Sequence, residues 1–554
     1  MPLHRLATSC AVVVFAHLAN AQEPTTTAAP APHVLIDALG PNAWLLRFAP
    51  TNLGSMLESE RGRALWQPRL LPLLDGWRQL VGDDDAFREQ RARVLGYGGR
   101  VRVALSLVAG QRDPQFTVAV RCDGDGHTDL AQLATDLGVL LTRATPGAWN
   151  DRDLGGRTIA VRELPNVVLT QPLVDQGGIV FAAAAAPQLN ATMAAAFAMP
   201  PGEPLTTRQL FTRPPLQVHF DLAGLLATTL AEEPDVDQRI FRALGCDSLG
   251  TLDLALATAG PRIAFEAALH FAKPDHGVFA GPFPATASLP ELPLALPKAT
   301  GTWRHGHFDF KACYEAIEQA IAAWNQEEPE KVRAKATKEL GCDPITDLLD
   351  HATDEVLFSM SPLGDGEPRE AMEALDWTLV VRLRDEAKFA KSFDMVVAES
   401  RPFLDKAGEE EHAGIKLLRF GNMFAYDLWY GIGNGVLLLG GGPTALDRLS
   451  AQIDALAAAK QAPAKAPETP ATFQELRKFL PAGGNGFATS ELETLVVAPE
   501  SLLGAFLVMY GFGRANAEDT SSADLLALLR ENNLGTVRTA SGYADATWRW
   551  HLYW

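Results

Sequence analysis

The sequence predicts an α+β fold in which one domain, a mainly antiparallel sheet with helices packed on it, occurs twice in tandem. Two observations lead to this prediction. The same landmarks return in the same order about 260 residues later in the chain, and a smaller unit of strand, helix, Leu-Gly pair and two strands occurs four times. Sheets of antiparallel strands whose helices lie on one face follow naturally from such units.

The landmarks of the proposed duplication are short and evenly offset. Phe116-Thr-Val-Ala-Val-Arg121 matches Trp377-Thr-Leu-Val-Val-Arg382 at an offset of 261 residues. Gly178-Ile-Val-Phe181 matches Gly435-Val-Leu-Leu438 at an offset of 257 residues. Landmarks in a constant order at a nearly constant spacing indicate two copies of one domain.

The smaller unit has a recognisable helix start and helix end. Each helical stretch follows a residue whose side-chain oxygen can accept from free backbone N–H groups. These residues are Thr51 or Asn52, Asp221, Asp309 and Ser490. Each Leu-Gly pair places a glycine where a left-handed residue commonly ends a helix. The pairs are Leu95-Gly96, Leu244-Gly245, Leu340-Gly341 and Leu534-Gly535.

The expected segments follow in chain order. They are a signal peptide (1–21), a flexible leader (22–40), the first copy (41–272), a proline-rich linker (273–300) and the second copy (301–554), with an internal linker at 460–472. Six prolines between Lys273 and Lys298 predict an extended connection between the copies. The first and second copies each carry an extension of helix, three strands and helix, expected at 129–197 and 385–456.

The first 21 residues have the three parts of a secretory signal peptide. Arg5 gives a weakly positive start, residues 10–18 form a mostly apolar run, and Ala19-Asn-Ala21 is a small-x-small cleavage site. We therefore expect an exported protein, in the periplasm or outside the cell. No later stretch reaches the roughly 20 apolar residues of a spanning helix, so we expect no transmembrane helix in the mature chain.

Four cysteines remain after the signal peptide: Cys122, Cys246, Cys313 and Cys342. An oxidising compartment permits disulfides, but the spacing of these residues favours none of the possible pairings. Buried free thiols explain the same residues equally well.

One candidate metal site lies on the strand that opens the second copy. His305, His307 and Asp309 fall on one face of that strand because side chains alternate with period two. Two imidazoles and a carboxylate suit zinc or another transition metal. Asp309 is also the expected helix cap, so a half-exposed polar strand face is the competing interpretation.

A second candidate resembles the start of a calcium loop. Asp123, Asp125 and Asp129 place oxygen donors near glycines that permit a sharp turn. The bidentate Glu expected at the twelfth position is missing, since residue 134 is Ala. A turn between strand and helix, capped by Thr128 or Asp129, is the alternative.

The chain ends in an aromatic strand, in which Trp548, Trp550 and Leu552 share one face. We expect a buried final strand. An exposed tryptophan row would instead indicate stacking against a sugar or another ligand.

Composition excludes one class of function. The 67 Asp plus Glu against 48 Lys plus Arg give a formal net charge of −19. Nucleic-acid binding is not expected, because phosphate recognition uses concentrated Lys and Arg. Gly-x-Ser-x-Gly, His-Glu-x-x-His and Cys-x-x-Cys motifs are also absent from the sequence.

The alternating half-modules and the signal peptide resemble exported bacterial repeat proteins of the domain-of-unknown-function type. The resemblance is one of pattern, over most of residues 40–554. It implies an exported repeat protein and assigns neither an activity nor site residues.

These observations favour a non-enzymatic exported protein of the cell envelope that binds an apolar ligand or a protein partner. No cofactor is expected, apart from zinc or calcium at the two candidate clusters. A metal-assisted hydrolase that uses His305, His307 and Asp309 is the first alternative. A structural or assembly protein is the second, and it predicts a large uncharged apolar patch and oligomerisation.

The signal peptide predicts the mature N-terminus. Cleavage after Ala21 would leave Gln22 as the first residue. Intact-mass analysis of the protein exported from its own signal sequence should give the mass of the chain from residue 22. A retained N-terminus in the exported fraction would contradict the prediction.

Overall fold

The computed structural model describes most of the chain between residues 32 and 553. The described residues are 32–64, 85–108, 115–200, 214–230, 235–273, 277–282, 291–293, 302–361, 376–399, 406–420, 428–461, 484–491, 528, 531–532, 534 and 536–553. The predicted signal peptide and most of the internal linker at 460–472 lie outside them. The chain divides into two compact units, Met1–Glu233 with Gly250–Ala267 (unit 1) and Pro234–Leu249 with Ala268–Trp554 (unit 2).

Unit 1 alternates strands and helices along the chain. Its elements are β1 (Val34–Leu39), α2 (Pro41–Phe48), α3 (Asn52–Glu58), α5 (Asp85–Gly96), β2 (Arg100–Val108), β3 (Gln115–Asp123), α6 (Leu130–Ala144), β4 (Asn150–Leu154), β5 (Arg157–Glu163), β6 (Val168–Thr170), β7 (Leu173–Asp175), β8 (Gly178–Ala184), α7 (Leu189–Ala198), β9 (Leu216–Asp221), α8 (Leu222–Leu230) and β10 (Leu249–Ala259). β11 (Arg262–Phe271) begins in unit 1 and ends in unit 2.

Unit 2 also contains both helices and strands along the chain. Its elements are α9 (Asp235–Ala243), the short turn η2 (Cys246–Ser248), α10 (Gly277–Ala280), β12 (Thr302–His307), α11 (Phe310–Asn325), α12 (Pro329–Leu340), the short turns η3 (Pro344–Leu348) and η4 (Leu349–His351), β13 (Ala352–Met360), β14 (Trp377–Leu383), α14 (Glu386–Glu399), β15 (Lys406–His412), β16 (Ile415–Phe420), β17 (Leu428–Gly433), β18 (Val436–Gly441), α15 (Ala445–Gln461), β19 (Gly484–Glu491), β20 (Thr536–Ala544) and β21 (Thr547–Tyr553).

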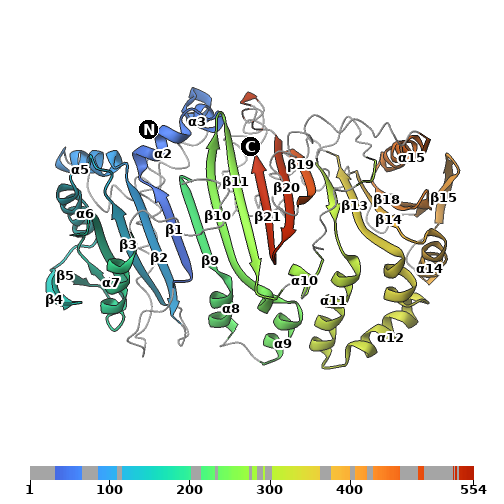
Figure 1. Cartoon of the computed structure of the whole chain (residues 1–554), viewed down its shortest axis with the longest axis horizontal. Helices are drawn as coiled ribbons and strands as arrows, with labels where there is room; N and C mark the ends of the chain where they lie inside the picture. Colours follow the sequence, from blue (N-terminus) through green and yellow to red (C-terminus); the bar gives the residue numbers. More distant parts are fainter. Residues whose placement is uncertain are drawn as a thin grey trace. The chain divides into compact units, whose positions relative to one another are not determined.

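Both units contain an antiparallel sheet. In unit 1 the paired strands run in the order β10, β9, β1, β2, β3 and β8, and β8 pairs at its other edge with β6 and β7. In unit 2 they run in the order β21, β20, β19, β12, β13, β14, β18, β17, β16 and β15. Antiparallel sheets with helices packed on them confirm the predicted α+β class (Figure 1).

The central strands have matching registers in the two units. Val118 of β3 pairs with Ala183 of β8, and Leu379 of β14 pairs with Leu439 of β18. The first residues of these pairs are 261 positions apart in the chain, as are the sequence landmarks. The match agrees with the predicted duplication, whose common origin stays a prediction.

Helices cover both faces of the central strands, whereas the sequence predicts helices on one face. In unit 1, Leu133 of α6 packs against one face of β3 and β8, and Met193 of α7 packs against the other. In unit 2, α14 and α15 take the two faces of β14 and β18. The reason is that consecutive residues of these strands are apolar, so each face needs a cover. The extensions also contain more strands than the predicted three: β4 to β8 in unit 1 and β15 to β18 in unit 2.

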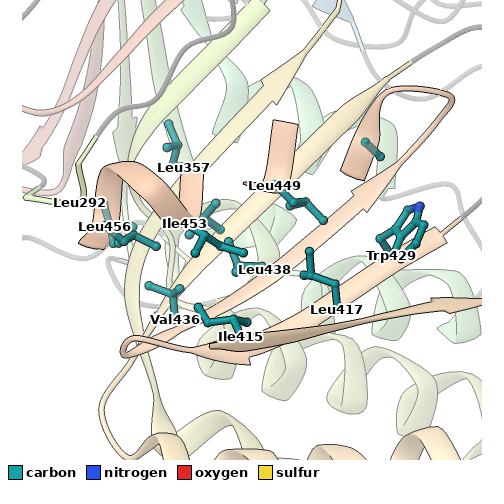
Figure 2. Close-up of a cluster of buried hydrophobic side chains, with 12 residues drawn as sticks. Leu292, Leu357, Ile415, Leu417, Trp429, Val436, Leu438, Leu449, Ile453 and Leu456 are labelled. Carbon is teal, nitrogen blue, oxygen red and sulfur yellow. The ribbon is translucent and has the colours of Figure 1, made fainter. Parts of the chain in front are cut away.

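The largest core cluster of unit 2 lies between α15 and its sheet. Figure 2 shows Leu449 and Ile453 of the helix facing Leu438 and Leu417 of the strands. All four side chains are fully buried. Burial of these four apolar side chains, more than helix propensity, stabilises the packing of α15 on the sheet.

The predicted helix caps are present wherever the structure describes them. Thr51 accepts from the backbone N–H of Gly54 at 3.0 Å, and Asp309 accepts from that of Ala312 at 3.0 Å. Asp221 accepts from the N–H of Gly224 at 2.9 Å. Ser490, predicted to follow a strand, lies within β19, and the helical stretch predicted after it lies outside the described residues.

Two of the glycines predicted to end helices have the left-handed backbone conformation. Gly245 has φ 82° and Gly341 has φ 75°, conformations that cost glycine little. The prediction was wrong for Gly96, which is the last residue of α5 and has no positive φ. Gly535 lies outside the described residues.

The core of unit 2 generates a first stability prediction. Leu438→Ala should lower the free energy of unfolding by about 2–5 kcal/mol, because it removes buried methyl groups and leaves a cavity. Leu46→Ala is the control, since that side chain is 70% exposed and should change stability by about 0.5 kcal/mol or less. Urea denaturation measures both, and equal effects would contradict the assignment of this core.

Candidate functional site

The side chains of the first candidate metal site, His305, His307 and Asp309, are not directed to one point, because each contacts a different neighbour. His305 is 3% exposed, and its Nε2 lies 3.2 Å from Oε1 of Glu355. His307 Nδ1 lies 3.2 Å from Oδ1 of Asp354. Asp309 caps α11 and turns toward the helix backbone. The predicted role of Asp309 as a helix cap is confirmed. The alternative prediction of a half-exposed polar strand face is wrong for His305, which is buried.

Glu355 is the centre of a buried polar cluster that the sequence analysis missed. Its Oε1 accepts from His305 and from the backbone N–H groups of Glu291 and Leu292. Its Oε2 lies 2.6 Å from Nε of Arg382. Burial by itself would raise the pKa of Glu355, but the hydrogen bonds and the charge of Arg382 outweigh it and hold this pKa below the ordinary value. A buried carboxylate with this many donors is a structural element of the sheet.

The calcium-like segment is an internally satisfied turn. Asp125 accepts from the N–H groups of His127 and Thr128 at 2.8 and 2.6 Å, and from the Thr128 hydroxyl at 2.8 Å. Asp123 lies 2.8 Å from Nε of Arg121. Asp129 caps α6 through the N–H groups of Ala131 and Gln132, as the alternative interpretation expects.

The three aspartates therefore point to three sets of partners. Although partial burial opposes it, hydrogen bonding within the turn holds the pKa of Asp125 below its usual range. Among the described residues, no group of three or more His, Cys, Asp and Glu side chains is arranged to hold a metal ion. Zinc and calcium binding remain predictions without support from these contacts.

The four cysteines in the described part of the chain are free thiols. Cys122, Cys246 and Cys342 are buried, and Cys313 is partly buried. Burial raises the pKa of Cys122 to about 12, which leaves it uncharged and unreactive at neutral pH.

Unit 2 exposes an apolar surface on its helices. Ile317, Ile321 and Trp324 lie on one side of α11 and are 45, 44 and 69% exposed. We call these three residues the apolar stripe. Their spacing of four and three residues places them in line over about 10 Å of helix.

Neighbouring helices add to this apolar surface. Figure 1 shows α9, α10, α11 and α12 next to one another, and α11 packs against the other three. Phe241 of α9 is 38% exposed, and Phe279 of α10 is 39% exposed. Five of the eight large exposed apolar side chains in the described part of the chain thus lie on three touching helices. Such a concentration differs from the scattered apolar residues of an ordinary surface.

Most lysine and arginine side chains near the apolar stripe form ion pairs. Ion pairs join Lys311 to Asp350 at 2.8 Å and Arg333 to Glu318 at 2.9 Å. Two more, Lys331 with Glu328 and Lys335 with Glu327, have distances of 3.1 and 2.6 Å. Four of the five lysines and arginines on α11 and α12 are therefore paired with carboxylates of unit 2. The i, i+4, i+7 spacing of the apolar stripe can be read from the sequence, but the exposure of its three side chains depends on tertiary packing.

The final strand is half-buried. Trp548 and Trp550 of β21 are both partly exposed, and their ring centroids are 3.7 Å apart. The predicted burial of this strand is thus only partial. In the described part of the chain, no helix has the length and apolar character needed to cross a membrane.

Comparison with known proteins identifies no relative. No protein-family model and no curated protein matches the chain. Among solved structures, crystal form III of TP0453 is 10% identical with a TM-score of 0.22, and the match covers 45% of this chain and 80% of that one. Crystal form I gives 10% identity, a TM-score of 0.19, and coverage of 46% and 80%. Similarity at this level carries no argument about function.

The Glu355 cluster predicts a pH-dependent stability. Because the pKa of Glu355 is lower in the folded state, its contribution is complete above the unfolded value of about 4.3 and is lost as the pH falls through the folded value. Glu355→Gln should lower the free energy of unfolding at neutral pH by about 3–5 kcal/mol, since it removes the nearer charged partner of Arg382 and leaves only Glu291, 3.7 Å away and exposed.

Urea denaturation at a series of pH values measures this effect. The difference between wild type and Glu355→Gln should shrink as the pH falls below about 4. Glu411→Gln, at an exposed position of β15, should follow the wild type. A pH-independent difference would argue against the proposed role of the carboxylate charge.

Proposed function

We propose that this protein is a non-catalytic, exported binding protein that holds an apolar helix of a protein partner against the apolar stripe of α11. The observation that carries the proposal is the line formed by Ile317, Ile321 and Trp324, exposed on one helix. Partners that dock an amphipathic helix present the same i, i+4, i+7 spacing of apolar side chains. Export rests on the signal sequence at residues 1–21.

Charge favours a protein over an anionic lipid surface. Membrane-surface helices combine an apolar face with free lysines and arginines that attract anionic headgroups. Here Lys311 and Arg333 are paired with carboxylates of unit 2. The net charge of −19 for the whole chain opposes such attraction further. An apolar segment of a protein requires no cationic surface.

The contacts of the polar clusters give the metal-assisted hydrolase no support. His305 contacts Glu355, and Asp309 caps a helix. A hydrolytic metal site needs its ligands directed to one point with an open position for water. These side chains are directed to separate partners instead, so the contacts favour the binding function over the metal-assisted hydrolase.

Site-specific photo-crosslinking tests the proposal. With benzoylphenylalanine in place of Trp324, crosslinking in the exporting cells should give one protein adduct, identified by mass spectrometry. Ile317→Ser should remove that adduct, because it breaks the line of apolar contacts. The same crosslinker at Gln319, an exposed position on another side of α11, is the matched control and should not give the adduct.

Three outcomes would contradict the proposal. They are an adduct with lipid alone, no adduct, or an adduct that survives Ile317→Ser and also forms from position 319. An adduct with a second copy of this chain would favour the assembly protein instead. Circular dichroism of the Ile317→Ser variant checks that loss of the adduct does not reflect unfolding.

A further inference from the structure

The turn between β17 and β18 is a second feature of unit 2, apart from α11. Asn434 and Gly435 are its two central residues, with φ 58° and 78°. Positive φ at both residues is the geometry of a type I′ hairpin turn, for which Asn-Gly is a preferred pair. The same pair favours attack of the glycine nitrogen on the asparagine amide, because glycine has no side chain to hinder the approach.

Two charged side chains contact the atoms that such an attack involves. Gly435 donates its backbone N–H to Oε2 of Glu386, on α14, at 2.6 Å. Lys460, in the last turn of α15, donates from Nζ to Oδ1 of Asn434 at 2.9 Å. A type I′ turn requires neither contact, since its backbone conformation defines it. The turn thus has a carboxylate at the nitrogen nucleophile and a cation at the amide oxygen.

The peptide unit of Gly435 is held in place, and the space beside it is open. Its carbonyl accepts from the N–H of Leu383 at 2.8 Å, while its N–H is bonded to Glu386. A Cβ atom added at Gly435 would meet no heavy atom within 4 Å. The hydrogen bonds to Glu386 and Lys460 both lie at the exposed surface. Solvent water therefore has access to the turn.

We propose that Asn434 is a site of self-catalysed deamidation. Glu386 accepts the proton of the Gly435 nitrogen, and this nitrogen forms a bond with Cγ of Asn434. Lys460 stabilises the negative charge that develops on Oδ1. The bond between Cγ and Nδ2 then breaks, and ammonia leaves with the proton that Glu386 had accepted. Water opens the resulting succinimide ring, which leaves aspartate or isoaspartate at position 434.

The reaction changes both the charge and the backbone of the turn. Either product replaces a neutral amide with a carboxylate, next to Glu386 and Lys460. Isoaspartate also routes the main chain through the former side chain, which adds one carbon to the backbone between β17 and β18. The site is separate from the apolar stripe and does not depend on the proposed function.

Peptide mapping by mass spectrometry tests the proposal on the full-length mature protein, incubated at neutral pH and sampled over weeks. The sequence contains one other Asn-Gly pair, Asn485-Gly486, which lies in β19 and serves as an internal reference. In the folded protein, succinimide, aspartate and isoaspartate should accumulate faster at position 434 than at position 485. In protein unfolded by urea, the two positions should convert at similar rates, because the contacts with Glu386 and Lys460 are lost.

Two variants test the roles of the charged side chains. Glu386→Gln should slow conversion of Asn434 at least about tenfold, since a positioned general base commonly contributes more than this. Lys460→Met should slow it at least about threefold, because the charge that develops on Oδ1 loses its cation. Glu399→Gln, at an exposed position near the other end of α14, is the matched control and should convert at the wild-type rate.

Three results would overturn the proposal. One is the absence of conversion at Asn434 in the folded wild type. Another is equal conversion in Glu386→Gln and Glu399→Gln. The third is faster conversion in Glu386→Gln than in wild type, which would show that the hydrogen bond to Gly435 protects the turn from attack.

Discussion

The two-sided burial of the central strands is the constraint on which both units depend. Consecutive residues such as Val380 and Val381 of β14 are buried, one on each face of the sheet. A strand with this pattern is stable only when apolar side chains cover both faces. The position of α14 on one face and α15 on the other follows from it. The same condition places α6 and α7 in unit 1.

Buried charge follows a second rule in this protein. Glu355 is matched by Arg382, and the buried Asp136 of α6 accepts two hydrogen bonds from Arg93 of α5. Such pairs add little net stability, but the loss of one partner is costly. Pairing with an arginine therefore explains these two buried carboxylates.

Local physical chemistry explains what the sequence by itself determined. The α+β class, the hairpins and the caps at Thr51, Asp221 and Asp309 depend on hydrogen bonds and side-chain alternation over a few residues. These features are decided within one segment of chain. The left-handed conformations of Gly245 and Gly341 belong to the same group.

Only the tertiary structure decided which partners the candidate site residues contact and whether they are buried or exposed. His305 and His307 share a strand, but Glu355 and Asp354 of the neighbouring strand determine what each one contacts. The exposure of Trp324 depends on which sides of α11 the other helices cover. Pairing, burial and exposure are set by residues far apart in the chain, and no local pattern encodes those distances.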